Sequence, residues 1–537
     1  LRWEDGGQVA SRTLVMPQTN VVLAAWFGLT AEIPPPEVAD PGEREAMVGV
    51  YYCLPLEVRS ESLPRVTVSN LPAGLSHNVA ANKIEGVPKA AVTNRLVTVR
   101  AANVNKTVVT NTFVMNVLPL PAWAQGGFSG SCLLRDGAVP GMAEMTVSAQ
   151  GAISGKLSAG GTNYTFKAGS YTNGGDFAFE TVAVAGKAKI PLVVTVTHPE
   201  VYTGGPASLG AAEGWLDGAE EVNVALWRNV WKDADMAGAL TNYAGYYTAT
   251  LPGGGETGSG YLLLTLDAMG GVKVAGKLAD GTSVSLSRTL ILDPAGRLFV
   301  FCHTAPSGYK GGGFWAPVEI VRPQEGPNVL RVLEGNECRW ESLDPLATDD
   351  YAAGGFSRKP GLTGGWYDKL GNLYDYYADR ALEVGTAGGP GTPELILNGE
   401  RVEAAWWDPA GIALTPVTNR YGVMTGLAAP KATSPVKIEG VYDYDETTNT
   451  VGLTVSLTRA TGVFKGKFKV WFDAGTTHTY KQVAYEGALT PVRADPEDGI
   501  EGRGFFLWPD KAAYLNAQNK LVSYGFNWSY DFLILLQ

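Results

Sequence analysis

The chain has 537 residues, of which 45% are hydrophobic and only 18% charged, so it is long and apolar enough to bury several cores. Its net charge is -11 and its 42 basic residues are scattered, which argues against nucleic acid or an anionic membrane surface as a partner. No apolar run reaches the roughly 18 residues of a membrane-spanning helix, so we expect no membrane insertion. At about 150 residues per domain, the length predicts three or four domains.

Short strands joined by tight turns are indicated by the 67 glycines and by a period-two alternation of apolar and polar residues. The alternation is clear in Ala143–Ala149 and Val451–Leu457, and turn sequences such as Asn173–Gly175 and Asp293–Gly296 interrupt such runs. Helical periodicity is nearly absent. The sequence therefore predicts an all-β, multidomain protein.

Residues 1–30 carry three short motifs in a fixed order: Arg2–Gly6 (Arg-Trp-Glu-Asp-Gly), Arg12–Pro17 and Val21–Phe27. This order resembles the end of a repeat found in bacterial surface proteins, although Arg2 stands where that repeat has an aromatic residue and its opening strands are missing. The resemblance implies that residues 1–30 are the tail of such a repeat. The chain starts at Leu1 without a Met or a basic leader, which we interpret as a sign of a longer precursor.

Residues 31–120 contain two turn motifs, Leu71–Leu75 (Leu-Pro-Ala-Gly-Leu) and Ile84–Pro88 (Ile-Glu-Gly-Val-Pro), followed by the strand-like runs Leu96–Asn103 and Thr112–Val117. Together these resemble an immunoglobulin-like domain that occurs in tandem in large bacterial surface proteins. The resemblance implies a seven-stranded sandwich that serves as a spacer or an adhesive module. We expect this sandwich to be separate from the sheet that starts near Phe128.

The strongest internal signal is a repeat with three copies, Val147–Phe166, Leu266–Leu286 and Leu457–Tyr480. Each reads as a strand, a turn, a strand that contains Gly-Lys, a turn and a third strand. A glycine inside a strand marks a bend or a close approach of two backbones, so we expect one structural position for the three glycines, Gly155, Gly276 and Gly466. The Gly-Lys pairs are not expected to bind phosphate, because no helix follows a glycine-rich loop there.

These copies predict three β-domains, over residues 124–235, 239–345 and 360–537. Six to eight strands in simple succession would close each one into an up-and-down barrel or a strongly curled sheet. The region after residue 124 also resembles C-terminal β-domains of secreted bacterial proteins. The predicted fold is thus an immunoglobulin-like sandwich followed by two or three antiparallel meander or barrel-like β-domains.

No catalytic site is recognisable in the sequence. The four histidines lack metal-ligand spacing, and no nucleophile elbow or phosphate loop occurs. The four cysteines are far apart, without a Cys-x-x-Cys pair, so no zinc site is predicted. Two interpretations of them stay open: free buried thiols, or a disulfide, for which Cys302 and Cys338 are the nearest pair in sequence.

Acidic residues gather in turn-like segments, where we expect them to be solvated, with no carboxyl group poised as an acid near neutral pH. Asp443, Asp445 and Glu446 are candidates for calcium coordination, because clustered carboxylates suit a hard cation. A solvated hairpin loop is the alternative for this segment. No other metal or cofactor is predicted.

Aromatic side chains are the most suggestive candidates for binding, since the chain has 14 Trp and 23 Tyr residues. Trp366, Tyr367, Trp406 and Trp407 could stack on sugar rings or contact a protein partner, or they could fill the cores of small barrels. In Trp406–Trp407 one ring should face inward and the other outward, if the segment is a strand.

These observations lead to one functional hypothesis and two alternatives. The hypothesis is a non-catalytic structural or adhesive protein of the cell surface or extracellular space, with other surface proteins or extracellular glycans as partners and possible self-assembly. The alternatives are a carbohydrate-binding region of a larger secreted enzyme, and a glycoside hydrolase whose carboxylates are not recognisable from sequence.

Overall fold

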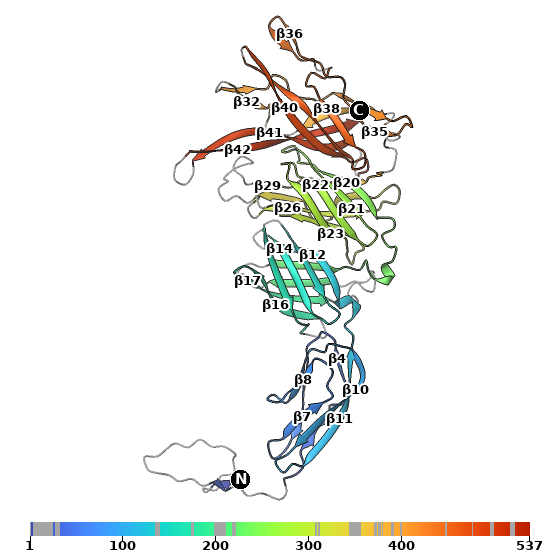
Figure 1. Ribbon diagram of the computed structural model, residues 1–537, viewed down its shortest axis with the longest axis vertical. Coiled ribbons are helices and arrows are strands. Elements are labelled where there is room, and N and C mark those ends of the chain that lie inside the picture. The colour runs from blue at the N-terminus through green and yellow to red at the C-terminus, as the bar shows by residue number, and fades with distance from the viewer. Residues whose placement is uncertain are drawn as a thin grey trace, which may run out of the picture. The chain divides into compact units, whose positions relative to one another are not determined.

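The computed structural model divides into two compact units, Leu1–Leu120 and Pro121–Gln537. Its elements are β-strands, together with the short 3₁₀ helices η1 (Ala122–Ala124) and η3 (Ala234–Met236) (Figure 1). The all-β, multidomain prediction is therefore confirmed. The structure describes residues 2–3, 25–26, 33–134, 140–159, 161–172, 177–197, 211–216, 222–306, 309, 312–342, 356–369, 373, 377, 380–387, 391–397, 400–445, 448–474, 476–493, 499–515 and 521–536.

The predicted tail of a surface repeat, residues 1–30, lies almost wholly outside the described residues. Only β1 (Arg2–Trp3) and β2 (Ala25–Trp26) are described there, and they pair antiparallel. Among all the described residues, no helix has both the length and the apolar character needed to cross a membrane.

The first unit is a sandwich of a four-stranded and a three-stranded sheet. The larger sheet has the order β4-β11-β10-β7, with β4 and β11 parallel, and the smaller has the order β5-β9-β8. Both contribute to one core, which includes Ile84, Val97 and Phe113. The strands are β3 (Glu37–Val38), β4 (Arg44–Met47), β5 (Tyr52–Pro55), β6 (Val58–Arg59), β7 (Arg65–Ser69), β8 (Leu75–Asn78), β9 (Lys83–Gly86), β10 (Val92–Ala102) and β11 (Val108–Leu118).

The two turn motifs of this unit interlock. Gly74 has a φ of +95°, and a Cβ there would lie 2.0 Å from the carbonyl oxygen of Val87. The amide of Val87 donates to the carbonyl of Gly74 at 3.1 Å, so the motifs hold each other through the backbone. Only glycine permits this approach, because any side chain would strike the neighbouring carbonyl.

The second unit begins with a closed barrel of eight antiparallel strands in simple succession. Its first strand, β12, pairs with β13 and β19, which closes the barrel. The up-and-down barrel expected for residues 124–235 is thus present. The strands are β12 (Gly126–Leu134), β13 (Gly141–Val147), β14 (Ile153–Ala159), β15 (Thr162–Ala168), β16 (Ala178–Ala185), β17 (Ala188–Thr197), β18 (Ala211–Leu216) and β19 (Val222–Arg228).

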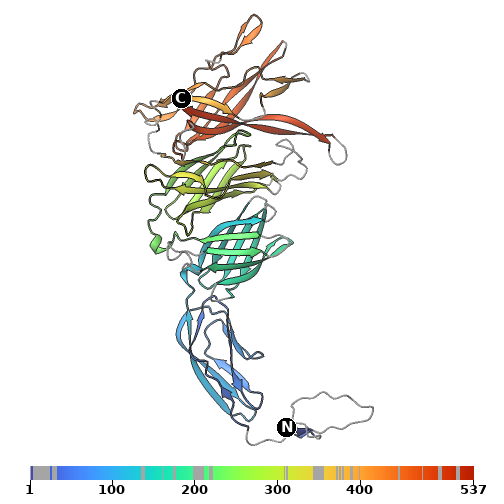
Figure 2. The same ribbon diagram turned by 180° about the vertical axis from the view of Figure 1, so that it is seen from behind.

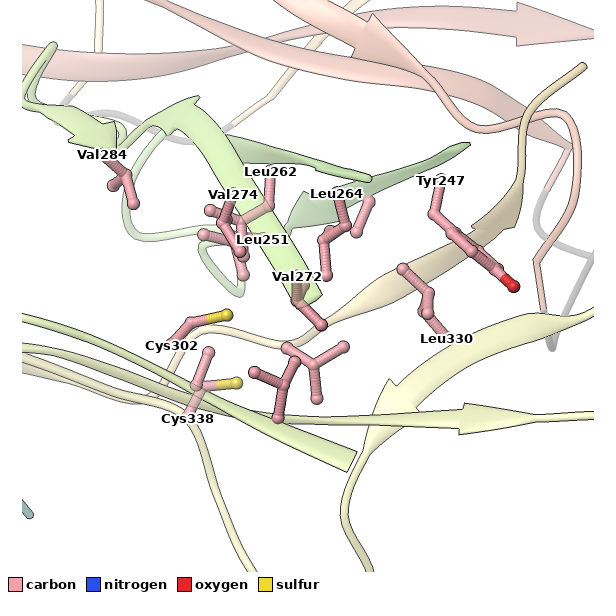
Figure 3. Close-up of a cluster of buried hydrophobic side chains, with 14 of the residues drawn as sticks. Tyr247, Leu251, Leu262, Leu264, Val272, Val274, Val284, Cys302, Leu330 and Cys338 are labelled. Atoms are coloured by element: carbon pink, nitrogen blue, oxygen red, sulfur yellow. The ribbon is translucent and has the colours of Figure 1, made fainter. Parts of the chain in front are cut away.

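The next sheet has eleven strands and curls so that its two halves enclose one hydrophobic core (Figure 3). Its main order is β23-β22-β21-β20-β30-β27-β26-β25-β24, and β28 and β29 extend it from β26. The strands are β20 (Gly245–Leu251), β21 (Gly260–Leu266), β22 (Gly271–Lys277), β23 (Ser283–Thr289), β24 (Ile291–Leu292), β25 (Leu298–Thr304), β26 (Gly313–Val321), β27 (Val329–Val332), β28 (Arg339–Ser342), β29 (Phe356–Arg358) and β30 (Thr363–Trp366).

Strands β29 and β30 extend this second β-domain past the boundary at residue 345 that the sequence suggested. β30 pairs with β20 and β27, so it completes the second sheet although its residues were assigned to the third domain. These pairings join segments that are distant in sequence, which is why a local pattern could not predict them.

The last sheet has eight strands in the order β35-β34-β31-β42-β41-β40-β39-β38 and encloses a core rich in aromatic rings. Two hairpins, β32–β33 and β36–β37, stand outside this sheet, as both views show (Figures 1 and 2). The strands are β31 (Leu382–Ala387), β32 (Glu394–Leu397), β33 (Glu400–Glu403), β34 (Ala413–Thr418), β35 (Met424–Ala428), β36 (Val436–Ile438), β37 (Val441–Asp443), β38 (Thr454–Thr458), β39 (Val463–Ala474), β40 (Thr477–Leu489), β41 (Ile500–Leu515) and β42 (Leu521–Leu536).

The three predicted repeat copies each form three successive antiparallel strands, with the glycine in the middle strand. A Cβ on each glycine would strike a carbonyl oxygen of the preceding strand, at 2.6 Å for Gly155, 2.1 Å for Gly276 and 1.8 Å for Gly466. In every copy this carbonyl belongs to the residue just before the glycine's own pairing partner. The predicted close backbone approach at one shared position is confirmed.

Candidate functional site

The predicted binding residues Trp366 and Tyr367 lie in packed cores. The ring of Trp366 meets that of Tyr247 edge-on, with 5.6 Å between centroids, and it packs against the core of the second β-domain. Tyr367 is only 1% exposed, and its hydroxyl donates to the carbonyl of Arg459 at 2.7 Å. Of the two uses that the sequence left open for these rings, the structure shows core packing.

Trp406 and Trp407 are both half-buried and point in different directions. The ring of Trp407 packs edge-on against Tyr530 of the third core, at 5.7 Å between centroids. Trp406 forms a β-bridge with Trp471, and its ring stacks on that of Tyr444 at 6.1 Å. Through Trp471, Trp406 contacts the β39–β40 hairpin.

The candidate calcium ligands do not assemble into a site in the described part of the chain. Asp443 lies in β37, opposite Val436, and both Asp443 and Asp445 are exposed. Glu446 lies outside the described residues. No group of three His, Cys, Asp or Glu side chains that could hold a metal ion occurs among the described residues.

All four cysteines are free, and only Cys53 is exposed. Cys302 pairs with Ala316 of β26, and the register between β26 and β28 places Cys338 beside Ala316 on its other side. Two strand spacings separate their Cα atoms by roughly 10 Å, beyond the limit of about 7 Å for a disulfide. Burial raises the pKa of both thiols to about 12, which leaves them protonated and unreactive.

The outer face of the β39–β40 hairpin gathers lysines and aromatic rings. Alternation along β39 buries its phenylalanines and Val470 in the third core and places Lys465, Lys467 and Lys469 on the opposite face. Pairing with β40 then places Tyr480 beside Trp471 and His478 beside Asp473. We call this surface the lysine–aromatic strip; it consists of Lys465, Lys467, Lys469, Trp471, Asp473, His478 and Tyr480. At a rise of 3.4 Å per residue it is about 27 Å long.

One end of the strip is an ordered stack of rings. The ring of Tyr442, from the β36–β37 hairpin, stacks on His478 with 3.5 Å between centroids, and His478 stacks on Trp471 at 4.7 Å. Nδ1 of His478 pairs with Asp473, which also accepts a hydrogen bond from Tyr444 at 2.9 Å. Burial and this hydrogen bond raise the pKa of Tyr444 above its ordinary value, so its hydroxyl stays a neutral donor.

Tyr480 is the accessible ring of this end, with 49% of its surface exposed. It meets Trp471 edge-on at 4.9 Å, which holds its position. Nζ of Lys469 lies over one face of the Tyr480 ring, 4.6 Å from its centroid, and 5.1 Å from the centroid of Trp471. A half-exposed ring beside a cation and hydrogen-bonding groups can take a ligand that has both an apolar face and polar substituents.

At its other end the strip borders a groove of about 860 Å³. Lys465 and Lys467 line it from the third β-domain, and Lys277 lines it from the second. Lys277 forms an ion pair with Glu486 across the groove. The basic residues are scattered along the sequence, and folding brings lysines from two domains together in this groove.

Asp531 is a buried carboxyl that the sequence did not indicate. It is 3% exposed, and its Oδ1 has no hydrogen-bond partner. Burial raises its pKa to about 6, although Ser259 and the charge of Arg503 act in the opposite direction. The sequence analysis considered acidic clusters in turns, whereas Asp531 lies within strand β42. Asp531 lies where the second and third sheets pack together and does not line the groove.

The strip was missed at the sequence level because its members look ordinary one by one. The alternation of β39 could have indicated that three lysines share a face, but not that Tyr442 of the β36–β37 hairpin would stack on His478. Comparison with protein families and with curated proteins finds no match to this chain. The resemblances of residues 1–27, residues 47–118 and the region after residue 124 to bacterial surface proteins therefore stay predictions.

Proposed function

We propose that this chain is a non-catalytic adhesive protein of an extracellular surface, and that its third β-domain binds carbohydrate on the lysine–aromatic strip. The observation that carries the proposal is the half-exposed ring of Tyr480, supported by Trp471 and flanked by Lys469. Aromatic faces stack on the C–H faces of sugars, and nearby polar groups accept or donate hydrogen bonds to the hydroxyls.

The adhesive part of the proposal is supported by architecture. In chain order, a two-sheet sandwich precedes three barrel-like domains, so the binding surface belongs to the last of several separate β-domains. The immunoglobulin-like resemblance of residues 47–118 and the surface-repeat resemblance of residues 1–27 agree with an extracellular location. Carbohydrates at cell surfaces are the ligand class that this location would offer.

The non-catalytic part of the proposal is supported by the surroundings of two histidines, His303 and His478. Burial and the nearby charge of Arg288 lower the pKa of His303 to about 4, so this ring stays neutral inside the second domain. His478 is held between Tyr442 and Trp471 and paired with Asp473, which leaves it as a structural member of the stack.

The proposal is tested by screening the whole chain on an array of neutral and charged glycans, followed by calorimetry with the best glycan. We expect Tyr480→Ala to lower the affinity at least about tenfold, equivalent to roughly 1.4 kcal/mol, without changing the melting temperature. Tyr421→Ala is the matched control, because Tyr421 is 71% exposed in a turn of the same domain. An absence of glycan binding, or an equal loss in both variants, would contradict the proposal.

The glycoside hydrolase alternative is checked in the same samples. A hydrolase would release new reducing ends from the bound glycan, and substitution of a single Asp or Glu would stop that release. Binding without new reducing ends is the result that we expect.

A further inference from the structure

The groove beside the strip concentrates positive charge in a chain that is acidic as a whole. Four lysines line it, Lys277, Lys465, Lys467 and Lys481, together with one acidic residue, Glu486, so its lining carries three net positive charges. The whole chain carries a net charge of -11. The local charge is therefore opposite in sign to that of the protein, and clefts of one sign concentrate ligands of the other.

The acidic group in the groove is already neutralised. Glu486 forms an ion pair with Lys277 and accepts a hydrogen bond from the hydroxyl of Tyr261 at 3.3 Å. Lys465 and Lys467 are exposed. Glu486 is the cross-strand neighbour of Lys465, but its ion pair is with Lys277, and neither Lys465 nor Lys467 forms a salt bridge within the described residues. The ammonium groups of Lys465 and Lys467 are therefore the positive charges of the groove that a ligand could neutralise.

Two lysines of the groove, Lys277 and Lys467, occupy equivalent positions in the second and third repeat copies. Lys277 and Lys467 each follow the mid-strand glycine of their copies, and both contribute to the groove. In the first copy the corresponding Lys156 instead pairs with Glu144 at 3.0 Å on the same barrel. The second and third copies therefore form a composite site that neither domain provides alone.

We infer that the ligand of this site is an anionic polysaccharide whose acidic groups meet the lysines of the groove while a sugar ring rests on Tyr480. This inference rests on the proposed function, because it specifies which carbohydrate the strip binds. The hydroxyls of a neutral chain would offer Lys465 and Lys467 only neutral hydrogen-bond acceptors, whereas carboxylates or sulfates would form charge-assisted hydrogen bonds, which are stronger.

A sparsely charged chain fits better than a densely charged one. Nucleic acid carries one negative charge per roughly 1.7 Å of duplex, and its binding requires many basic contacts. The groove has few free lysines, and the net charge of -11 would repel a dense polyanion. A polysaccharide with one acidic group every one or two sugars matches both the number of lysines and the accompanying aromatic ring.

The test uses the whole chain and hyaluronan oligosaccharides, with carboxyl-reduced hyaluronan as the uncharged counterpart. We expect the acidic form to bind more tightly, with an affinity that falls as salt rises, because salt screens exposed charges. We expect Lys465→Gln/Lys467→Gln to lower that affinity roughly tenfold, since exposed charge pairs are individually weak. Lys187→Gln/Lys189→Gln is the matched control, because both lysines are exposed on the first barrel.

Different outcomes separate the inference from the proposed function. If acidic and reduced chains bind equally and the Lys465/Lys467 variant is unaffected, the anionic assignment is overturned while carbohydrate binding stands. If Tyr480→Ala has no effect and no glycan binds, the proposed function itself fails. Binding of duplex DNA or polyglutamate as tightly as hyaluronan would overturn the polysaccharide class.

Discussion

Asp531 provides a sharp test of the electrostatics, because its buried carboxyl makes stability depend on pH. The pKa of the folded state is about 6, against 3.8 for an unperturbed group. The folded chain therefore binds this proton more tightly than the unfolded chain, and stability falls as pH rises from 3.8 towards 6. A shift of about two pH units corresponds to about 3 kcal/mol, which is the cost of ionising Asp531 once pH exceeds the folded pKa.

We expect Asp531→Asn to raise the free energy of unfolding of the second unit above pH 6 by up to about 3 kcal/mol and to have little effect below pH 3.8. The assay is urea denaturation of the whole chain, followed by tryptophan fluorescence at pH values on both sides of this window. Other carboxyls titrate as well, so the quantity to compare is the difference between the original chain and the variant. Asp443→Asn, at an exposed aspartate, controls for loss of surface charge. A difference that does not change with pH would refute the reasoning.

Three further predictions concern a close backbone contact, a buried ion pair and the cysteine thiols. Gly466→Ala would place a Cβ 1.8 Å from a carbonyl oxygen and should destabilise the chain by about 3 kcal/mol in a melting experiment. The control is Gly426→Ala, where a Cβ would have nothing within 4 Å, and it should change stability by less than about 0.5 kcal/mol. Glu501 and Arg493 form a fully buried ion pair at 3.4 Å. Glu501→Gln should therefore lower the free energy of unfolding in denaturant by about 3–5 kcal/mol, and replacing both residues by apolar ones should recover most of this loss. No recovery in the double variant would contradict this account. Thiol titration of the native protein should detect Cys53 alone and, after unfolding, four thiols; a second fast-reacting thiol would show that the assigned burial is wrong.

Much of the fold was predictable because it depends on local patterns. Alternation along each strand and the glycine-rich turns indicated an all-β chain, and the three Gly-Lys copies predicted equivalent three-strand units. Close backbone approach at Gly155, Gly276 and Gly466 could be expected from sequence, since a glycine inside a strand is unfavourable unless a side chain would clash. The start of the first barrel near Phe128 could also be predicted, because the motifs of residues 31–120 end before it.

The candidate site was less predictable, because burial depends on which sheets meet. The sequence left binding and core packing open for Trp366 and Tyr367. Tyr367 is part of the third core and Trp366 packs against the second, and no local pattern distinguishes a ring that faces a neighbouring sheet from one that faces water. Tyr480 ends the third repeat copy, and nothing in its local sequence marks it as a binding residue. Its role depends on Trp471 beside it and on the β36–β37 hairpin, which stacks Tyr442 over His478.

Short-range steric and solvation effects account for the features that could be read from the chain alone: strands, tight turns, repeated Gly-Lys units and a low density of charge. The tertiary structure alone decided where charge and exposed aromatic surface collect. Lys277 is far from Lys465 and Lys467 along the chain, and they share a groove only because the second and third sheets pack together. An average over the sequence describes an acidic chain with scattered lysines, whereas a ligand would encounter the local field of the groove, which long-range contacts produce.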